Sequence, residues 1–477
     1  MIALTLAQVA TAVGGELAAG ANPQTVVMGP VVVDSRAVTP GALFVAVAGA
    51  RVDGHEHAAD ALSAGAAACL ATRPVGMPTV VVDDTVVALG RLAAAVVARL
   101  ERCTVIGVTG SQGKTGTKDL LAHVLSAAGA TVATQGNYNN EIGVPLTALR
   151  AETDTEFLVV EMGARGRGHI RFLSELVQPT IGCVLNVGTA HLGEFGTREA
   201  IAEAKGELIE ALPGTGTAVL NADDPVVLGM SKRTSARVLT FGQSPEAQLQ
   251  VADLRTESDG CAAFDLVHRT AGAVEQVPVR LHLLGEHQAL NAAAAAGVAL
   301  AAGCRLADVA TALGTAAPAS RWRMQPTERA DGVLVVNDAY NANPDSMQAA
   351  LKTLVALSRA RGGRSFAVLG EMAELGEQTT SAHDAVGRLA VRLDVDQLVV
   401  VGEAARTLHL GACLEGSWGS ESILVPDADA AVVTLRQLVR PGDTVLVKAS
   451  RAAALERVAE ALIADAPPAA APHPEQP

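Results

Sequence analysis

Hydrophobic positions along the chain switch repeatedly between two periodicities, and the clearest switch lies at residues 105–125. Residues 105–108 are apolar or small, which is typical of a buried strand. From 120 to 125, leucine and valine recur at the spacing of one helix face. The segment between them, G-S-Q-G-K-T-G, therefore joins a strand to a helix.

The first hundred residues contain a small set of similar elements. β-branched runs predict strands at 26–33, 43–47 and 79–82, and helical spacing predicts helices at 56–64 and 84–100. Together they indicate a first α/β domain, residues 1–100, of a size that can form its own core.

A second domain is expected over residues 101–318, since A-P-A-S interrupts the pattern near its end. Apolar runs at 157–160 and 181–185 predict strands of a parallel sheet. Residues 236–284 alternate as antiparallel strands do, and Asp259 and Gly260 form a turn signal within them. An alanine-rich helix should follow. The second domain is thus a parallel sheet extended by antiparallel strands.

A third domain, residues 319–466, alternates strand and helix most regularly. Strands are predicted near 333–336, 365–369, 397–401, 422–426 and 444–447, each followed by a helix. This order favours a parallel, doubly wound, Rossmann-like sheet. The proline- and alanine-rich tail, 467–477, cannot bury a core and is expected to be disordered. The predicted fold class is therefore α/β with three domains.

Composition narrows the functional classes. Of 477 residues, 49% are hydrophobic and only 2% aromatic, so Ala, Val and Leu must fill the cores. A net charge of −14 provides no basic stripe for nucleic acid. The apolar run 292–302 is too short to cross a bilayer, and no signal sequence is evident. Six cysteines lie far apart, as in a reduced protein. We expect cytoplasmic residence, no stable membrane insertion and no nucleic-acid partner.

The loop between the strand at 105–108 and its helix has the chemistry of a phosphate site. Gly110 and Gly113 let successive N–H groups converge at the positive end of the helix. Lys114 adds a mobile cation, and Thr115 adds a hydroxyl of the kind that binds magnesium. Val108 replaces the first glycine of the general pattern, so the match is to the T-G-S-x-G-K-T variant. ATP is the expected ligand, and a glycine-rich turn without a ligand is the alternative.

Other polar clusters are ambiguous when each is taken alone. Glu161 ends the predicted strand at 157–160, where an acid near a phosphate loop can bind magnesium. His191 follows the next strand and Lys205 lies on the following helix, but a loop histidine and a surface lysine are common. The asparagines of G-N-Y-N-N-E, and the D-S-R turn at 34–36, can bind polar ligands or simply form turns.

Eight ordered motifs make the chain resemble the Mur ligases over nearly its whole length. They are T-G-S-Q-G-K-T, G-N-Y-N-N-E-I-G-V-P, E-M-G-A-R-G-R-G-H-I, N-V-G-T-A-H-L, E-A-K-G-E, N-D-A-Y-N-A-N-P-D-S-M, L-G-E-M-A-E-L-G and V-K-A-S-R. The Y-N-A-N-P and L-G-E-M segments are similar to the branch that adds D-alanyl-D-alanine.

That resemblance implies a uridine-nucleotide-binding first domain, an ATPase second domain and a Rossmann-like third domain. It implies an ATP-dependent ligase that joins D-alanyl-D-alanine to a UDP-N-acetylmuramoyl-tripeptide in peptidoglycan precursor synthesis, with two Mg²⁺ ions. Lys205 is expected to be carbamoylated, and the protein to act as a monomer.

The resemblance also assigns residues to these roles. The implied catalytic residues are Lys114, Lys205, His191 and Glu161, and the metal ligands are Thr115, Glu161, His191 and carbamoylated Lys205. The implied ATP-binding residues are Gly110, Ser111, Gln112, Gly113, Lys114, Thr115, Gly116, Asn291, Arg323 and Asp338. The implied UDP-substrate residues are Asp34, Ser35, Arg36, Asn137 and Asn140.

One departure and three rival interpretations stay open. Gln288 stands where the family usually has asparagine, and it lengthens the reach of that amide. The family branch that adds a diamino acid or lysine usually carries a D-N-P-R-like motif, which this sequence lacks. Folylpolyglutamate synthases should lack a uridine-binding domain. An ATP-binding scaffold would hydrolyse nucleotide without forming an amide, and it would leave the residues Glu161, His191 and Lys205 without a role.

Overall fold

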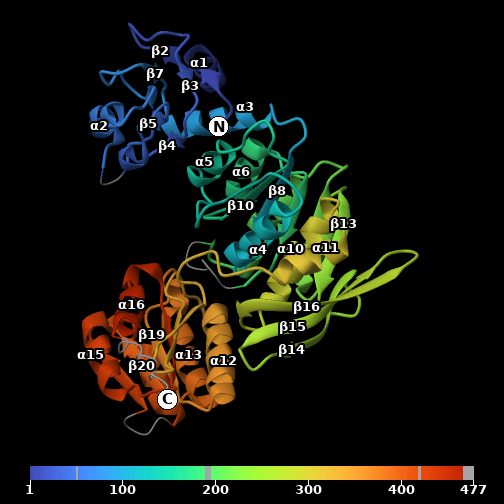
Figure 1. The fold of residues 1–477 in the computed structure, drawn as a ribbon, viewed down its shortest axis with the longest axis vertical. Coiled ribbons are helices and arrows are strands. Elements are labelled where there is room, and N and C mark those ends of the chain that lie inside the picture. Colours follow the sequence, from blue (N-terminus) through green and yellow to red (C-terminus); the bar gives the residue numbers. More distant parts are fainter. Residues whose placement is uncertain (50–51, 189–194, 417–420, 466–477) are drawn as a thin grey trace, which may run out of the picture.

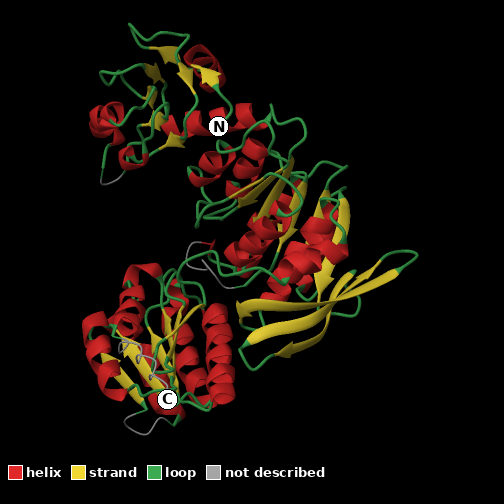
Figure 2. Cartoon of the chain, viewed as in Figure 1, coloured by secondary structure: helices red, strands yellow, loops and turns green. Residues whose placement is uncertain are grey.

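The computed structural model describes residues 1–49, 52–188, 195–416 and 421–465. Three sheet-containing units follow one another along the chain, with the N-terminal and C-terminal units at opposite ends of the molecule and the central unit between them (Figure 1). Helices and strands are mixed in each unit (Figure 2), so the α/β class is confirmed. The predicted tail, 467–477, and His191 lie outside the described residues.

The N-terminal unit is a five-stranded sheet in the order β2-β7-β6-β5-β4, with β1 and β3 as a separate pair. Neighbouring strands from β4 to β7 are parallel, and β2 is antiparallel to β7. Its elements are β1 (Leu4–Thr5), α1 (Leu6–Val13), β2 (Glu16–Leu17), β3 (Val26–Val27), β4 (Val31–Val32), β5 (Leu43–Val45), α2 (Ala58–Ser63), β6 (Ala68–Ala71), β7 (Thr79–Val81) and α3 (Thr85–Val97).

The single strand predicted at 26–33 is wrong, because the structure divides it into β3 and β4. Strand β3 pairs with β1, whereas β4 pairs with β5 in the main sheet. Gly29 and Pro30 lie between them, and proline has no N–H to continue a ladder. The apolar run therefore serves two different sheets.

The central unit has a nine-stranded sheet in the order β16-β15-β14-β13-β12-β11-β8-β10-β9. Strands β8 to β14 pair in parallel, and β14, β15 and β16 form an antiparallel extension as predicted. Its strands are β8 (Thr104–Thr109), β9 (Thr131–Ala133), β10 (Phe157–Glu161), β11 (Ile181–Val184), β12 (Thr217–Asn221), β13 (Arg237–Gly242), β14 (Leu249–Thr256), β15 (Cys261–Arg269) and β16 (Val274–Leu284).

Helices cover both faces of the central sheet. One face carries α4 (Lys114–Ser126), α10 (Gln288–Ala301) and α11 (Leu306–Leu313), and the other carries α5 (Gly143–Ala148), α6 (His169–Val177) and α8 (Arg198–Glu210). The short helix α9 (Pro225–Gly229) follows β12. Seven alanines of α10 are fully buried, and their small side chains let this helix lie close to both α4 and the sheet. With few aromatic side chains in the chain, this part of the core is filled by a helix that packs closely.

The C-terminal unit confirms the predicted doubly wound sheet. Its order is β17-β18-β22-β19-β20-β21, in which all pairs are parallel except β17 with β18. Helices α12 to α14 cover one face, and α15 and α16 cover the other. Its elements are β17 (Gln325–Glu328), β18 (Leu334–Asn337), α12 (Pro344–Arg361), β19 (Ser365–Leu369), α13 (Thr379–Arg392), β20 (Gln397–Val401), α14 (Arg406–Glu415), β21 (Ser422–Val425), α15 (Ala428–Leu438), β22 (Thr444–Lys448) and α16 (Glu456–Ala464).

Apolar cores connect neighbouring units. Helix α3 shares a core with α5 and α6 of the central unit. Cys261 and Leu284, at one end of the antiparallel extension, share a core with Leu354 and Leu357 of α12. Helix α12 is thereby placed beside the central unit. Within the described ranges, no helix is both long and apolar enough to cross a bilayer.

Candidate active site

The predicted loop does connect β8 to α4, and its shape depends on glycine at position 113. Gly113 has φ +79°, and a Cβ there would lie 2.5 Å from Oδ1 of Asn291. In the part of the chain that the structure describes, no side chain caps the N-terminus of α4. The first N–H groups of a thirteen-residue helix are therefore available to an anion.

Lys114 lies folded over the loop. Its Nζ donates hydrogen bonds to the carbonyl oxygens of Gly110, at 2.7 Å, and Ser111, at 3.4 Å. Burial lowers the pKa of Lys114 from its ordinary 10.5; the Glu161 carboxylate opposes this shift and the Arg323 guanidinium adds to it. Since the described partners of this partly buried cation are carbonyl oxygens, it can exchange them for a charged ligand.

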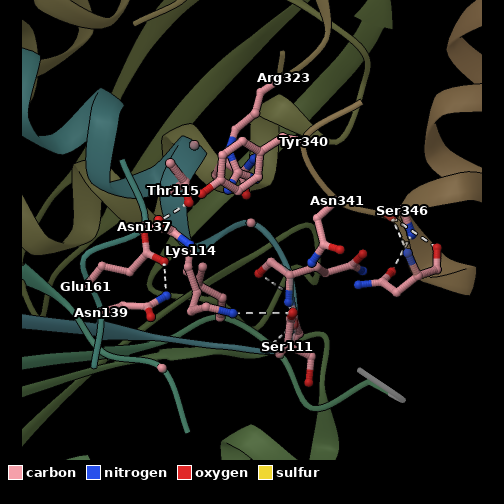
Figure 3. Close-up of a pocket in the computed structure, with 18 of the residues that line it drawn as sticks. Ser111, Lys114, Thr115, Asn137, Asn139, Glu161, Arg323, Tyr340, Asn341 and Ser346 are labelled. Atoms are coloured by element: carbon pink, nitrogen blue, oxygen red, sulfur yellow. Dashed lines mark hydrogen bonds between the residues drawn. The ribbon is translucent and has the colours of Figure 1, made fainter. Parts of the chain in front are cut away.

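Glu161 is buried at the end of β10, the parallel neighbour of β8. Its Oε2 accepts a hydrogen bond from the Thr115 hydroxyl at 2.9 Å, and its Oε1 accepts one from Nδ2 of Asn139 at 2.8 Å (Figure 3). The structure thus brings two of the predicted metal ligands into direct contact. Asn139 was missed, although it belongs to the asparagine-rich motif that contains Asn137 and Asn140.

Lys205 is 3% exposed on α8, which contradicts the surface-lysine alternative. Burial lowers its pKa well below 10.5, and the nearby Lys114 cation lowers it further. Its ammonium donates no hydrogen bond to another described residue. Since His191 lies outside the described residues, its predicted place beside Glu161 and Lys205 stays a prediction.

A cavity of about 520 Å³ joins the central and C-terminal units above the loop. It is lined by residues predicted for the ATP and metal sites and by two predicted for the UDP-substrate site. The predicted residues on its wall are Ser111, Gln112, Gly113, Lys114, Thr115, Gly116, Asn137, Asn140, Glu161, Lys205, Asn291, Arg323 and Asp338. Asn137 and Asn140 thus lie with the phosphate loop and apart from residues 34–36.

The C-terminal wall of this cavity contains a buried ion pair. Nζ of Lys448 lies 2.6 Å from Oδ2 of Asp338 and also donates to the carbonyl oxygen of Asn341. The Arg323 guanidinium lies 4.2 Å from the centre of the Tyr340 ring, and both side chains point toward Thr115 (Figure 3). Lys448 and Tyr340 were missed as site residues, although their motifs had been recognised.

Asn291 contacts the loop from α10. Its Oδ1 accepts a hydrogen bond from the Thr117 hydroxyl at 3.4 Å, and its Nδ2 donates to Oε1 of Gln288 at 2.9 Å. Gln288 also lines the cavity, so its longer side chain still reaches the predicted nucleotide residue.

The turn at 34–36 lies apart from the cavity, and its charged side chains are exposed. Asp34 caps a short 3-10 helix, Ser35–Ala37, and its carboxylate accepts hydrogen bonds from the Arg36 side chain at 2.7–3.2 Å. These bonds lower the pKa of Asp34 to about 2. The Arg36 side chain is 88% exposed, and the turn does not line the cavity. Residues 34–36 and the phosphate loop are therefore two separate candidate sites.

Three family models match the chain along its length. Residues 30–102 match the Mur ligase family, catalytic domain; residues 108–299 match the Mur ligase middle domain; and residues 322–451 match the Mur ligase, glutamate ligase domain. The chain belongs to the Mur ligase family. Within it, a UDP-N-acetylmuramoyl-tripeptide–D-alanyl-D-alanine ligase of Mycobacterium bovis is 49% identical, with 98% of each chain covered. The enzyme of that name from Escherichia coli is 35% identical over 97% of this chain and 99% of its own.

Solved Mur ligase structures have the same arrangement. MurF from Acinetobacter baumannii matches with a TM-score of 0.86 and 32% identity, covering 97% of this chain and 99% of its own. MurF ligase from Thermotoga maritima, in complex with ADP, matches with a TM-score of 0.77 and 32% identity, covering 91% and 97%. The predicted resemblance to the Mur ligases is confirmed.

Proposed function

We propose that this Mur ligase joins D-alanyl-D-alanine to the terminal carboxylate of UDP-N-acetylmuramoyl-tripeptide and converts ATP to ADP and phosphate. The names of relatives that align over nearly the whole chain support this substrate pair. The ADP complex of the similar Thermotoga maritima ligase supports the nucleotide. The product would be a UDP-linked pentapeptide for peptidoglycan synthesis.

The observation that carries the proposal is the set of buried and partly buried charges at the end of α4. Lys205 and Glu161 are buried and Lys114 is partly buried beside an uncapped helix N-terminus. Two neighbouring cations withdrawn from water destabilise the protein unless negative charge compensates them, and a triphosphate supplies that charge. This is the electrostatic environment that phosphoryl transfer requires.

The buried oxygens suit magnesium. The Thr115 hydroxyl and the Glu161 carboxylate are in contact, and hard oxygen ligands of this kind fit Mg²⁺. Among the described residues, no three His, Cys, Asp or Glu side chains converge, which fits an ion that takes its other ligands from phosphates and water. Thr115 would hold one ion, and Glu161, His191 and a carbamoylated Lys205 would hold a second. Bound magnesium supplies positive charge that offsets the charge of the phosphates.

The chemistry follows from the poor reactivity of a carboxylate. The tripeptide carboxylate oxygen attacks the γ-phosphorus of ATP, the bond to the β–γ bridging oxygen breaks, and ADP leaves. The acyl phosphate that results is attacked by the amine of D-alanyl-D-alanine, which loses a proton and expels phosphate as the amide forms. Lys114 stabilises the charge on the transferred group. The buried wall of the cavity limits loss of the acyl phosphate to water.

Lys205 is suited to carbamoylation. CO₂ adds only to a neutral amine, and burial lowers the pKa of Lys205 so that this form is accessible. The carbamate is an anion, so the modification would replace one of two neighbouring cations with a group that can bind metal. It also relieves the repulsion between Lys205 and Lys114.

Each unit would have its own binding role. We assign UDP-substrate binding to residues 1–100, with Asp34, Ser35 and Arg36, and ATP binding to residues 101–318. Residues 319–466 would complete the ATP site through Arg323 and Asp338. Asn137 and Asn140 would meet the substrate where it approaches the phosphate loop. A monomer in the cytoplasm, where ATP is supplied, suffices for this scheme.

A mixing experiment tests the proposal. Pure protein is incubated with ATP, magnesium, D-alanyl-D-alanine and UDP-muramoyl peptides of different lengths, and phosphate release and product mass are measured. We expect release only when tripeptide and dipeptide are both present, with one amide formed per phosphate. Release without amide formation would indicate an ATP-driven scaffold, and reaction with a single diamino acid in place of the dipeptide would indicate the preceding branch of the family.

A further inference from the structure

Asn186, which follows β11, holds the phosphate loop from outside it. Its Oδ1 accepts hydrogen bonds from the N–H groups of both Ser111 and Gln112, each at 3.0 Å. Its Nδ2 donates to the carbonyl oxygen of Gln112 at 3.2 Å. One side-chain amide therefore uses both its acceptor and its donor on two consecutive residues of the loop. Asn186 has no role in the function proposed above.

The backbone that carries Asn186 is itself fixed. The N–H of Val187 donates to Oδ2 of Asp224 at 2.8 Å, and the carbonyl oxygen of Val187 accepts from Nε of Arg198 at 2.9 Å. The N–H of Gly188 donates to the Ser111 hydroxyl at 2.9 Å. Because this segment is anchored on both sides, Asn186 is a rigid support for the loop.

We propose that Asn186 is a positioning residue of the ATP site, which selects the N–H groups that bind phosphate. It occupies the N–H groups of Ser111 and Gln112, and so directs the anion to the N–H groups of 113–116 at the end of α4. Ser111 and Gln112 then give the loop its shape, while Lys114 and the helix end supply the charge. This inference rests on the proposed ATP-dependent function.

Two substitutions distinguish loss of the hydrogen bonds to the loop from the effect of an added negative charge. Asn186→Ala removes the three side-chain hydrogen bonds and leaves the Gln112 N–H without its acceptor, whereas the Ser111 N–H keeps the backbone carbonyl oxygen of residue 186, at 3.1 Å. Asn186→Asp keeps the acceptor, loses the donor, and places a negative charge beside the phosphates. Because like charges repel strongly where water is excluded, the aspartate should be the more harmful to nucleotide binding. A merely structural asparagine would show the opposite order, since Asp preserves the two bonds to the loop.

The control is Asp223→Ala. Asp223 also holds two consecutive backbone N–H groups, those of Gln243 and Ser244, at 2.7 and 2.8 Å, but it lies outside the cavity wall. Its removal should lower the melting temperature without changing the KM for ATP. Asp223→Ala therefore shows how the loss of similar side-chain hydrogen bonds affects stability at a place that binds no phosphate.

The experiment measures ADP binding by calorimetry, KM and kcat for each substrate, and melting temperature. We expect Asn186→Ala to weaken ADP binding and raise the KM for ATP on the order of tenfold, as the loss of neutral hydrogen bonds allows. Asn186→Asp should do so on the order of a hundredfold, because the added charge repels the phosphates. The KM values for the tripeptide and dipeptide should change little. Asn186 variants that lower only the melting temperature, as Asp223→Ala does, would overturn the proposal. If the wild-type protein forms no amide, the proposed function fails. The ADP-binding measurements would still test the positioning role of Asn186.

Discussion

The phosphate loop and the turn at 34–36 both place charged side chains at a predicted ligand site, but in opposite surroundings. Lys205 and Glu161 are buried in the central unit, and Lys114 is partly buried beside them. Asp34 and Arg36 are exposed and satisfy each other. Buried charges are costly, so their presence together indicates chemistry, whereas an exposed ion pair contributes little to stability. The phosphate loop is therefore suited to catalysis, whereas the turn at 34–36 is suited to binding a substrate.

The pKa shifts of the two regions have different causes. In the central unit, desolvation is the main cause that lowers the pKa of both Lys114 and Lys205. In the turn, hydrogen bonds from Arg36 lower the pKa of Asp34. The first cause makes a charged group easier to neutralise or modify, and the second fixes a charge. Substitutions in the two regions should therefore differ in size and in the kinetic constant they change.

The largest effect is expected from Lys114→Met, which keeps the length of the side chain and removes its charge. The rate of amide formation should fall on the order of a thousandfold, because the transferred phosphoryl group loses its cation. Lys118→Met is the matched control, since Lys118 is a buried lysine one turn later on α4 that pairs with Asp119. We expect the control to lose stability and keep most of its rate. Equal rates for the two variants would contradict the assignment of Lys114.

Lys205→Ala should remove most activity, by about a hundredfold or more, because an anionic metal ligand is lost. Added formate or acetate should restore part of it by supplying a carboxylate in the space left by the side chain. Rates are measured with and without these anions at constant ionic strength. Lys114→Met serves as the control, since a carboxylate cannot replace a cation. Full activity of Lys205→Ala, or equal rescue of both variants, would reject the carbamate.

A smaller, thermodynamic effect concerns Lys205 before modification. Its pKa is lowered in the folded protein, so the unfolded chain binds more protons between that value and 10.5. In CO₂-free buffer, the free energy of unfolding should rise with pH across this window, by at most about 1.4 kcal/mol per pH unit for one proton. Below the lowered pKa the penalty of the buried ammonium is fully present. Lys205→Met should remove this part of the pH dependence and stabilise the protein at the acidic end, as measured by urea unfolding.

Elements with strong hydrophobic patterns were predictable. The strands predicted at 365–369 and 397–401 have the bounds of β19 and β20 in the structure. Strand β17 was not predicted, because Q-P-T-E has no apolar alternation and is tolerated only as an edge strand. The split of 26–33 into β3 and β4 depends on which neighbours each half pairs with, and a local pattern contains no information on distant partners.

The candidate site shows the same limit. Motifs identified Lys114, Glu161 and Lys205 in the sequence, but the contact between Thr115 and Glu161 spans forty-six positions and depends on β8 lying beside β10. Asn186 was missed because its role is to hold the backbone of a loop, which sequence spacing cannot reveal. Functional residues within one motif can be identified from the sequence. Residues of another segment that hold such a motif in place can be identified only from the folded structure.

The smallest effect is expected at the turn, from Arg36→Ala. Removal of one exposed guanidinium should raise the KM for the UDP-linked tripeptide by a few fold, because a contact between solvent-exposed charges contributes little, and leave the KM for ATP unchanged. Arg73→Ala is the matched control, because Arg73 is an exposed arginine of the same unit that pairs with Asp53. Steady-state kinetics at several salt concentrations compare the two, since screening should weaken the contribution of Arg36. If Arg36→Ala behaves as Arg73→Ala does, or changes the KM for ATP, the turn is not the uridine site, and the division between reaction and recognition would have to be drawn elsewhere in the N-terminal unit.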